Sequence, residues 1–268
     1  MQAQANEIPA SSHQRFLRLF LLGLIGVAGL SFAVTPMLQL HALPADAPPV
    51  SLPALVLLSL VQPVLLLALG TAIGGAVANR VGLRSLVAEW THSGPPLLPR
   101  LRAAAPLAVA LGLAVAAVTL ALDVLFFKPL LPEFFDHART VQPHAVETTL
   151  SGILYGGITE ELIMRWGIMS LLVWLAWRWM QRDGKMPRPV FVWSGVVLSA
   201  ALFALLHLPA AGMIAPLTVL SISRILLLNG IAGIAFGWLF WKRGLEAGMI
   251  SHASVHAFLF LAVLAGLG

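Results

Sequence analysis

The stretch LAVALGLAVAAVTLAL, residues 107–122, would present apolar side chains on every face of a helix. At a rise of about 1.5 Å per residue, about 20 such residues cross the roughly 30 Å hydrocarbon core of a bilayer. A second stretch, LALGTAIGGAV at 67–77, has the same character. Strands of a membrane β-barrel alternate apolar and polar residues, and neither stretch does so. Both stretches therefore predict transmembrane helices.

The whole chain has the composition of an integral membrane protein. Of its 268 residues, 59% are apolar and 10% are charged, and the mean hydropathy is +0.91. These values predict an all-α, polytopic transmembrane helix bundle with about seven spans, a multi-pass protein that we expect in the cell (plasma) membrane. The predicted spans are 16–40, 53–79, 103–127, 149–177, 190–208, 217–241 and 246–266.

The positive charges alternate between the segments that connect these spans. Outer segments hold only Lys128 and Arg139, and Arg165 and Arg224 fall within spans. Cytoplasmic loops carry an excess of Lys and Arg, so this distribution predicts a cytoplasmic N-terminus. The same loops explain the net charge of +5, and we expect the lipid bilayer, with no nucleic acid, as a partner. The remaining cations, all in inner segments, are Arg15, Arg18, Arg80, Arg84, Arg100, Arg102, Arg178, Arg182, Lys185, Arg188, Lys242 and Arg243.

Three charges lie deep in the fourth predicted span, in the sequence GGITEELIMRWG at 156–167. A charged side chain at the centre of a bilayer costs about 2.5–3.5 kcal/mol on insertion scales, so such residues usually face a bundle interior or an aqueous cavity. Glu161 and Arg165 are four residues apart and can pair on one face of an α-helix. Glu160 points elsewhere and needs another partner, a proton or water. The pair could be purely structural, whereas Glu160 is harder to explain without a function.

Histidines on two later spans could supply that partner. The fifth span ends in FALLH, with Phe203 and His207 one helical turn apart. The seventh span contains HASVH, with His252 and His256 on one face. Taken alone, His207 could simply join two helices by a hydrogen bond. Three helices that each carry an ionisable group could instead converge on one polar site.

In this order, the motifs EELIMR, FALLH and HASVH resemble those of the CPBP family, membrane peptidases that include the type II CAAX prenyl endopeptidases and proteins linked to bacteriocin self-immunity. The family pattern is E-E-x-x-x-R, F-x-x-x-H and H-x-x-x-N on three membrane helices. The resemblance covers roughly residues 149–265. We therefore predict a three-span region without diagnostic motifs at 1–148 and a four-span CPBP-like catalytic region at 149–268.

The resemblance implies an intramembrane endopeptidase that needs no metal or other cofactor and cleaves a membrane-associated protein or peptide. Glu160 and His207 would activate a water molecule, and His252 and His256 would face the oxyanion. Supporting roles would fall to Glu161 and Arg165, which hold the helix and its electrostatics, and to Phe203.

His256 departs from the family pattern, because the motif has asparagine at its position. An amide always offers a donor, whereas a neutral imidazole donates from one nitrogen only. The substitution opens an alternative, a zinc-dependent membrane metallopeptidase whose ligands would be His207, His252, His256 and Glu160. With no cysteine in the chain, a thiolate site is excluded.

Two further classes of function stay open. A non-catalytic membrane immunity or scaffold protein could use the polar residues for helix packing alone. A proton-coupled transporter could use buried Glu and His as a relay, although the chain has no internal repeat. The spans also pose a geometric problem, because straight-helix arithmetic puts Glu160 and His256 near the midplane but His207 close to the outer end of its span.

Overall fold

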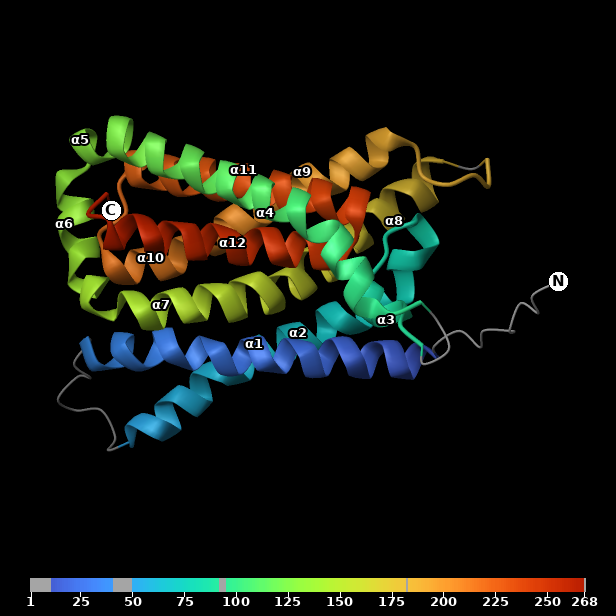
Figure 1. Ribbon diagram of the computed structural model, residues 1–268, viewed down its shortest axis with the longest axis horizontal. Helices are drawn as coiled ribbons and strands as arrows, with labels where there is room; N and C mark the ends of the chain where they lie inside the picture. Colours follow the sequence, from blue (N-terminus) through green and yellow to red (C-terminus); the bar gives the residue numbers. More distant parts are fainter. Residues whose placement is uncertain (1–10, 41–49, 92–94, 182, 268) are drawn as a thin grey trace.

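The computed structural model describes residues 11–40, 50–91, 95–181 and 183–267, and within these ranges every regular element is a helix. The prediction of an all-α bundle is confirmed. Figure 1 shows the long helices lying side by side along the long axis of the molecule. The elements are α1 (Ser12–Leu40), α2 (Leu52–Val77), η1 (Ala78–Val81), α3 (Leu86–Glu89), α4 (Leu97–Leu122), η2 (Asp123–Phe127), α5 (Lys128–Leu130), α6 (Pro132–Ala138), η3 (Arg139–His144), α7 (Ala145–Ser151), η4 (Gly152–Glu160), η5 (Leu162–Met169), α8 (Ser170–Met180), α9 (Pro189–Leu206), α10 (Leu208–Ile214), α11 (Val219–Arg243) and α12 (Leu245–Leu264).

Six helices of the described residues are long and apolar enough to cross a membrane. The predicted span at 149–177 is not among these six, although it lies in an uninterrupted helical segment from 145 to 180. Figure 1 shows α7 near the end of the bundle closed by α5 and α6, and α8 near the opposite end. The segment thus runs the length of the bundle. The count of seven spans stays a prediction. The six candidates are Ser12–Gln39, Leu52–Val81, Leu97–Leu130, Pro189–Ile214, Val219–Arg243 and Leu245–Leu264.

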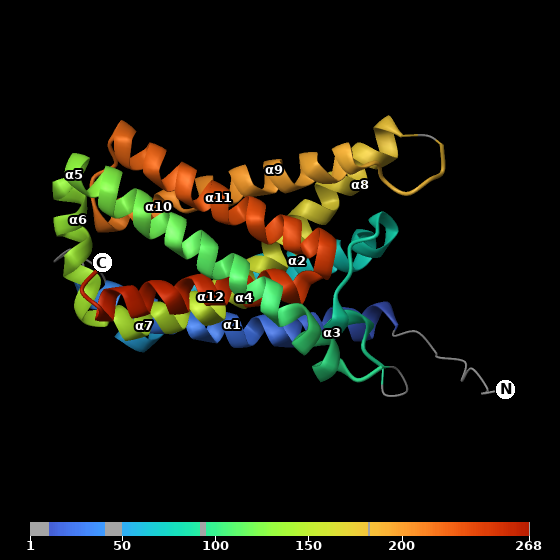
Figure 2. The same ribbon diagram turned by 45° about the horizontal axis from the view of Figure 1, so that its top comes forward.

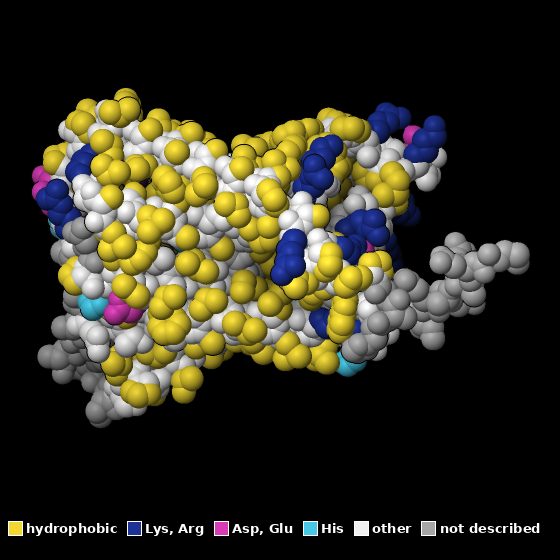
Figure 3. All heavy atoms as spheres, in the orientation of Figure 1, with side chains coloured by type: hydrophobic (Ala, Val, Ile, Leu, Met, Phe, Trp, Pro, Cys, Tyr) yellow, Lys and Arg dark blue, Asp and Glu magenta, His cyan; other side chains and the backbone are white. Residues whose placement is uncertain are grey.

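The surface of the bundle is suited to the hydrocarbon interior of a membrane. Figure 3 shows a broad band of hydrophobic side chains across one face, with Lys and Arg gathered toward one end. Large apolar side chains along the helices are strongly exposed, among them Leu57 at 67%, Leu58 at 68% and Leu125 at 78%. In water such a continuous apolar surface would drive association, whereas in lipid it costs nothing. The protein is therefore an integral membrane protein.

The bundle is held together by one large apolar core and by close contacts between backbones. Figures 1 and 2 both show α1 on one side and α9 with α11 on the other. The core joins Leu19 of α1 and Leu67 of α2 to Trp166 of η5, so it crosses the predicted boundary between 148 and 149. Small residues permit the approach, because a Cβ on Gly167 would lie 2.7 Å from the Cα of Gly70.

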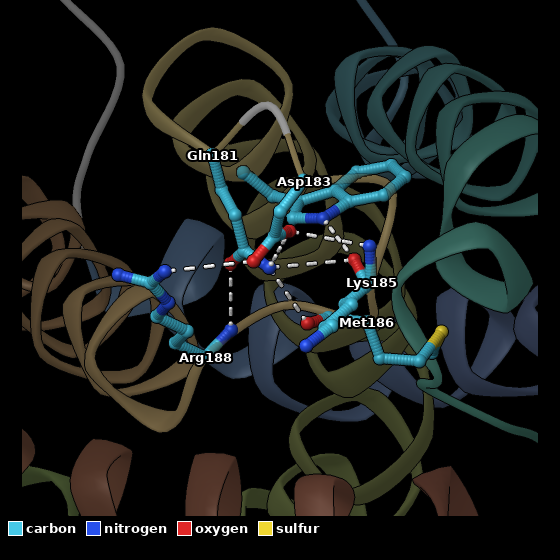
Figure 4. A network of polar contacts seen from close by, with 6 residues as sticks. Gln181, Asp183, Lys185, Met186 and Arg188 are labelled. Atoms are coloured by element: carbon cyan, nitrogen blue, oxygen red, sulfur yellow. Dashed lines mark hydrogen bonds and ion pairs between the residues drawn. The ribbon is translucent and has the colours of Figure 1, made fainter.

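The connection between α8 and α9 is ordered by one buried glutamine (Figure 4). Gln181 accepts a hydrogen bond from the backbone of Arg188 at 3.0 Å and donates to Asp183 at 2.8 Å and to the carbonyl of Met186 at 3.1 Å. The donors on Gln181 and on the backbone of Lys185 lower the pKa of Asp183. The carboxylate therefore stays ionised beside the cations of this loop.

A buried carboxylate fastens the short helix α3 to the start of α12. Glu246 is 5% exposed and accepts hydrogen bonds from the hydroxyl of Ser85 at 2.6 Å and from the backbone of Leu86 at 3.0 Å and Val87 at 2.9 Å. The negative charge also lies in the first turn of α12, where the helix dipole favours it. This contact joins segments about 160 residues apart in the sequence.

We expect Glu246→Gln to destabilise the protein by about 2 kcal/mol or more, because an uncharged amide accepts weaker hydrogen bonds and turns two donors toward the donors of α3. Thermal unfolding in detergent micelles, followed by circular dichroism, measures this loss. The matched control is Glu133→Gln, which changes an exposed acid of α6. Equal midpoints for the two variants would show that Glu246 contributes nothing specific.

Candidate active site

The two adjacent glutamates lie where two π-helical segments meet. Glu160 ends η4 and Glu161 directly precedes η5. A π-helix has i→i+5 hydrogen bonds and is found mostly as short bulges, frequently at functional sites. The α-helical spacing from which the directions of Glu160 and Glu161 were predicted therefore does not describe this segment. The predicted spacing still brings Arg165 to Glu161, with 3.3 Å between Nε and Oε2.

Glu161 and Arg165 form the buried centre of a charged network. Both side chains are 0% exposed. The second carboxylate oxygen of Glu161 lies 3.0 Å from Nδ1 of His252 on α12. Because a carboxylate only accepts hydrogen bonds, Nδ1 of His252 carries the proton and donates it, which leaves Nε2 of a neutral ring as an acceptor. Glu161 thereby fixes the tautomer and the orientation of His252.

Aromatic rings and one carbonyl complete the surroundings of Arg165. Its Nη2 donates to the carbonyl of Gly233 on α11 at 3.3 Å. The guanidinium carbon lies 4.5 Å from the ring centroid of Phe203 and 5.4 Å from that of Phe236. Ring faces attract a cation, most strongly where water is excluded. Phe203 thus has a physical role in the network, as a ring that stabilises the buried guanidinium.

The two histidines of α12 are stacked on one another. The ring centroids of His252 and His256 are 5.2 Å apart, and their Nε2 atoms are 3.3 Å apart. Since Nε2 of neutral His252 is an acceptor, His256 donates to it. Phe236 lies parallel to His252, with the centroids 4.5 Å apart and the planes at 20°. Glu161, His252 and His256 therefore form a continuous hydrogen-bonded chain.

His207 lies at a joint between two helices. It follows the end of α9 and precedes α10, and its Nδ1 donates to the carbonyl of Phe203 at 2.7 Å. The donation leaves Nε2 as an acceptor. Pro209 has no N–H to continue the ladder of α9, which accounts for the turn at this point.

The joint corrects the predicted end of the fifth span. The candidate span continues through α10 to Ile214 instead of ending at 208, so His207 lies about 10 Å of helix rise before the end of the span. The depth conflict with Glu160 came from a boundary that was placed too early. The helix bends near Pro209 and then continues.

Glu160 and His207 open into the same cavity, whose volume is about 270 Å³. Its polar lining also includes Tyr155 of η4 and Gln62 of α2. No hydrogen bond or ion pair joins the Glu160 carboxylate to another described side chain. It is close enough to interact electrostatically with Tyr155 and His252. The lining of the cavity thus includes a carboxylate without a hydrogen-bonded side-chain partner and an imidazole whose Nε2 can accept a hydrogen bond.

Several residues of the site were not identified from the sequence. Gln62 and Tyr155 line the cavity, and Gly152 and Gly156 allow the histidines to approach η4. A Cβ on Gly156 would lie 3.1 Å from Nε2 of both His252 and His256. The signal was present, since GILYG at 152–156 has the small-xxx-small spacing of close membrane helix contacts. Gln62 carries no such signal.

The zinc alternative requires a set of ligands that the described residues do not assemble. No group of three or more His, Cys, Asp or Glu side chains among them is placed to hold a metal ion. His252 and His256 lie together, whereas Glu160 and His207 belong to the cavity. Glu160 and His207 are nevertheless close enough to His252 to interact with it electrostatically, so the two pairs are neighbours.

Residues 142–258 match the family model described as type II CAAX prenyl endopeptidase Rce1-like. In these residues the chain is similar to the CAAX protease family. The resemblance predicted from the three motifs is thereby confirmed, and the match indicates a membrane protease. No curated protein and no solved structure matches the chain.

The CAAX protease region includes every candidate catalytic residue, but it does not include the whole cavity. Glu160, His207, His252 and His256 all lie within the matched residues. Gln62 and the rest of α2 lie outside them and form one wall. The match begins a few residues before the predicted boundary at 149, and the division of the chain into two regions stays a prediction.

We expect Gly152→Ala to lower protease activity at least about tenfold, because the new Cβ would lie 2.3 Å from Nδ1 of His256 and displace the ring. The control is Gly75→Ala in α2, whose Cβ would meet nothing within 4 Å. Cleavage by each purified variant in proteoliposomes measures the effect, and circular dichroism checks the fold. Full activity of Gly152→Ala would show that the position of His256 is unimportant.

Proposed function

We propose that the protein hydrolyses a peptide bond of a membrane-associated protein or peptide by means of a water molecule activated by Glu160 and His207. The observation that carries this proposal is that both side chains line one cavity inside the bundle. The carboxylate has no described side-chain partner, and Nδ1 of His207 is already used by Phe203. Each group therefore has free acceptor capacity toward the cavity.

The proposed reaction uses Glu160 as general base. Its carboxylate takes a proton from water while Nε2 of His207 orients that water, and the oxygen attacks the scissile carbonyl carbon. The tetrahedral intermediate then collapses as the C–N bond breaks, and the proton held by Glu160 passes to the leaving amine. The products are a carboxylate and an amine, and no metal or cofactor takes part.

In the proposed mechanism His252 and His256 polarise the substrate carbonyl. An oxyanion is stabilised by donors aimed at it, and the N–H of neutral His256, which lies beside Nε2 of His252, is the proposed donor. The carboxylate of Glu161 on Nδ1 fixes the ring of His252, and His252 in turn holds His256 in place. Glu161 and Arg165 thus act as positioning residues, because they work through His252.

The proposed membrane arrangement places this chemistry within a seven-span protein of the plasma membrane with a cytoplasmic N-terminus. In Figure 1 the start of α1 and the end of α12 lie at opposite ends of the bundle, as an odd number of crossings requires. The cations gathered at one end in Figure 3 support a cytoplasmic assignment of that end.

We expect Glu160→Gln to lower the rate of cleavage by about 10²-fold or more, because the variant lacks the general base. The stability should not fall, because the side chain is only partly buried. Quantitative proteomics of membranes from cells that carry wild-type or Glu160→Gln protein identifies substrates that accumulate uncut, and Glu133→Gln serves as control. The purified proteins are then compared on a substrate found in this way.

Glu161→Gln provides the contrast, because it leaves buried Arg165 without its counter-charge and should destabilise the fold by about 3–5 kcal/mol.

If Glu160→Gln left both the membrane proteome and cleavage unchanged, the protein would be a scaffold whose polar residues serve packing only.

One observation favours the zinc mechanism as a second candidate, namely the 3.3 Å approach of the two Nε2 atoms of His252 and His256. The variant His256→Asn separates the mechanisms. An amide is a good oxyanion donor but is not among the usual ligands of zinc. We expect the variant to keep at least about a tenth of wild-type activity after stringent chelation. If chelation abolished the activity of the wild type and added Zn²⁺ restored it, the metal mechanism would be established instead.

A further inference from the structure

A second cavity, of about 390 Å³, lies at the end of the bundle where α3 is found in Figure 1. Its walls come from the segment after η1, the first turns of α4 and the junction of α11 with α12. The charged side chains in its lining are Arg84, Arg100, Lys242, Arg243 and a single acid, Glu89. Its volume falls within the range of small-ligand sites in proteins.

The positive charges of this cavity exceed the negative charge available to them. Glu89 is shared, with its oxygens 3.0 Å from Arg84 and 3.9 Å from Arg100. The hydrogen bond to Glu89 raises the pKa of Arg84, so that guanidinium is always charged. Among the described residues no acid pairs with Lys242 or Arg243. The lining therefore attracts an anion.

The backbone of the cavity is fixed in place. The N–H of Leu245 donates to the carbonyl of Arg84 at 3.0 Å, and Gly244 turns the chain between α11 and α12 with a φ of 98°. Just beyond, Glu246 holds the start of α3 through three hydrogen bonds. A site whose walls are already ordered binds a ligand at a lower entropic cost.

The position of the cavity indicates the source of the anion. Its lining includes residues at or next to the ends of the spans Leu52–Val81, Leu97–Leu130, Val219–Arg243 and Leu245–Leu264. Trp241 is part of the lining, with the ammonium of Lys242 3.5 Å from its ring centroid. Tryptophan is enriched at the level of lipid headgroups. An anion bound here therefore lies where the phosphates of a membrane leaflet lie.

We propose that this cavity binds the phosphate of an anionic phospholipid headgroup. Guanidinium groups bind phosphate oxygens in bidentate geometry, and basic pockets between membrane helices suit such headgroups. Free inorganic phosphate has the same chemistry but lacks the acyl chains that would hold it at the interface. A bound lipid would join the ends of α4 and α11 to the segment that precedes α3.

Native mass spectrometry of the full chain in detergent tests the proposal, with phosphatidylglycerol and phosphatidylcholine as probes. The double variant Lys242→Gln/Arg243→Gln removes two exposed cations of the cavity. The control Arg178→Gln/Lys185→Gln removes two exposed cations of the α8–α9 region outside the lining. We expect phosphatidylglycerol to bind at least about tenfold more weakly to the cavity variant and within about twofold of wild type to the control.

Equal weakening in both double variants, or none in either, would overturn the proposal, as would equal retention of the two lipids by the wild type. A parallel titration with inorganic phosphate separates the sources. If phosphate alone displaced phosphatidylglycerol at comparable concentration, the site would be one for the free anion. Thermal unfolding monitors the fold of each variant, and Arg100→Gln offers a second, single change in the lining that should also weaken lipid binding.

Discussion

Two opposite charges, on Glu161 and Arg165, lie in the interior of the bundle with no exposure to the surroundings. Taking either charge out of water alone would be prohibitive, so each requires the other together with further polar or aromatic partners. Those partners come from other helices, since His252 is on α12 and Phe203 is on α9. The requirement to compensate one ion pair thus draws the helices with catalytic candidates toward a common point.

The partners of this ion pair also distinguish Glu161 from its neighbour in the sequence, Glu160. Glu161 has its oxygens engaged with Arg165 and His252, whereas Glu160 faces a cavity and keeps its oxygens available. A carboxylate satisfied by fixed partners is suited to hold other groups in place. A carboxylate beside open space is suited to exchange a proton with water. Adjacent positions with the same side chain therefore have different surroundings, which suit the different roles proposed for them.

Much of this arrangement could be predicted from the sequence, because it follows from spacing along one helix. The span near 107–122, the contact of Glu161 with Arg165 and the order of the motifs are of this kind. Contacts between helices depend on their crossing and register, which a single sequence does not encode in a readable form. The hydrogen bond from His252 to Glu161 and the share of Gln62 in the cavity belong to this second kind.

Local backbone geometry was the other feature that could not be predicted from the sequence. Nothing in GILYGGITE at 152–160 marks a π-helix, since its hydrogen bonds shift by one residue without any residue type that requires it. The fifth span was predicted to end at 208, whereas the helical segment bends near Pro209 and continues through α10 to Ile214. Both errors concern the backbone, and neither altered which side chains were candidates for the site.

The wall that α2 contributes to the cavity lies outside the residues that match the CAAX protease family. In the proposed mechanism, the groups that break the bond and the wall opposite them are therefore encoded in separate stretches of the gene. In that mechanism, substitutions in α2 can change which peptides fit the cavity while Glu160 and His207 stay the same. Proteins with the same reactive residues can in this way diverge in the peptides they recognise.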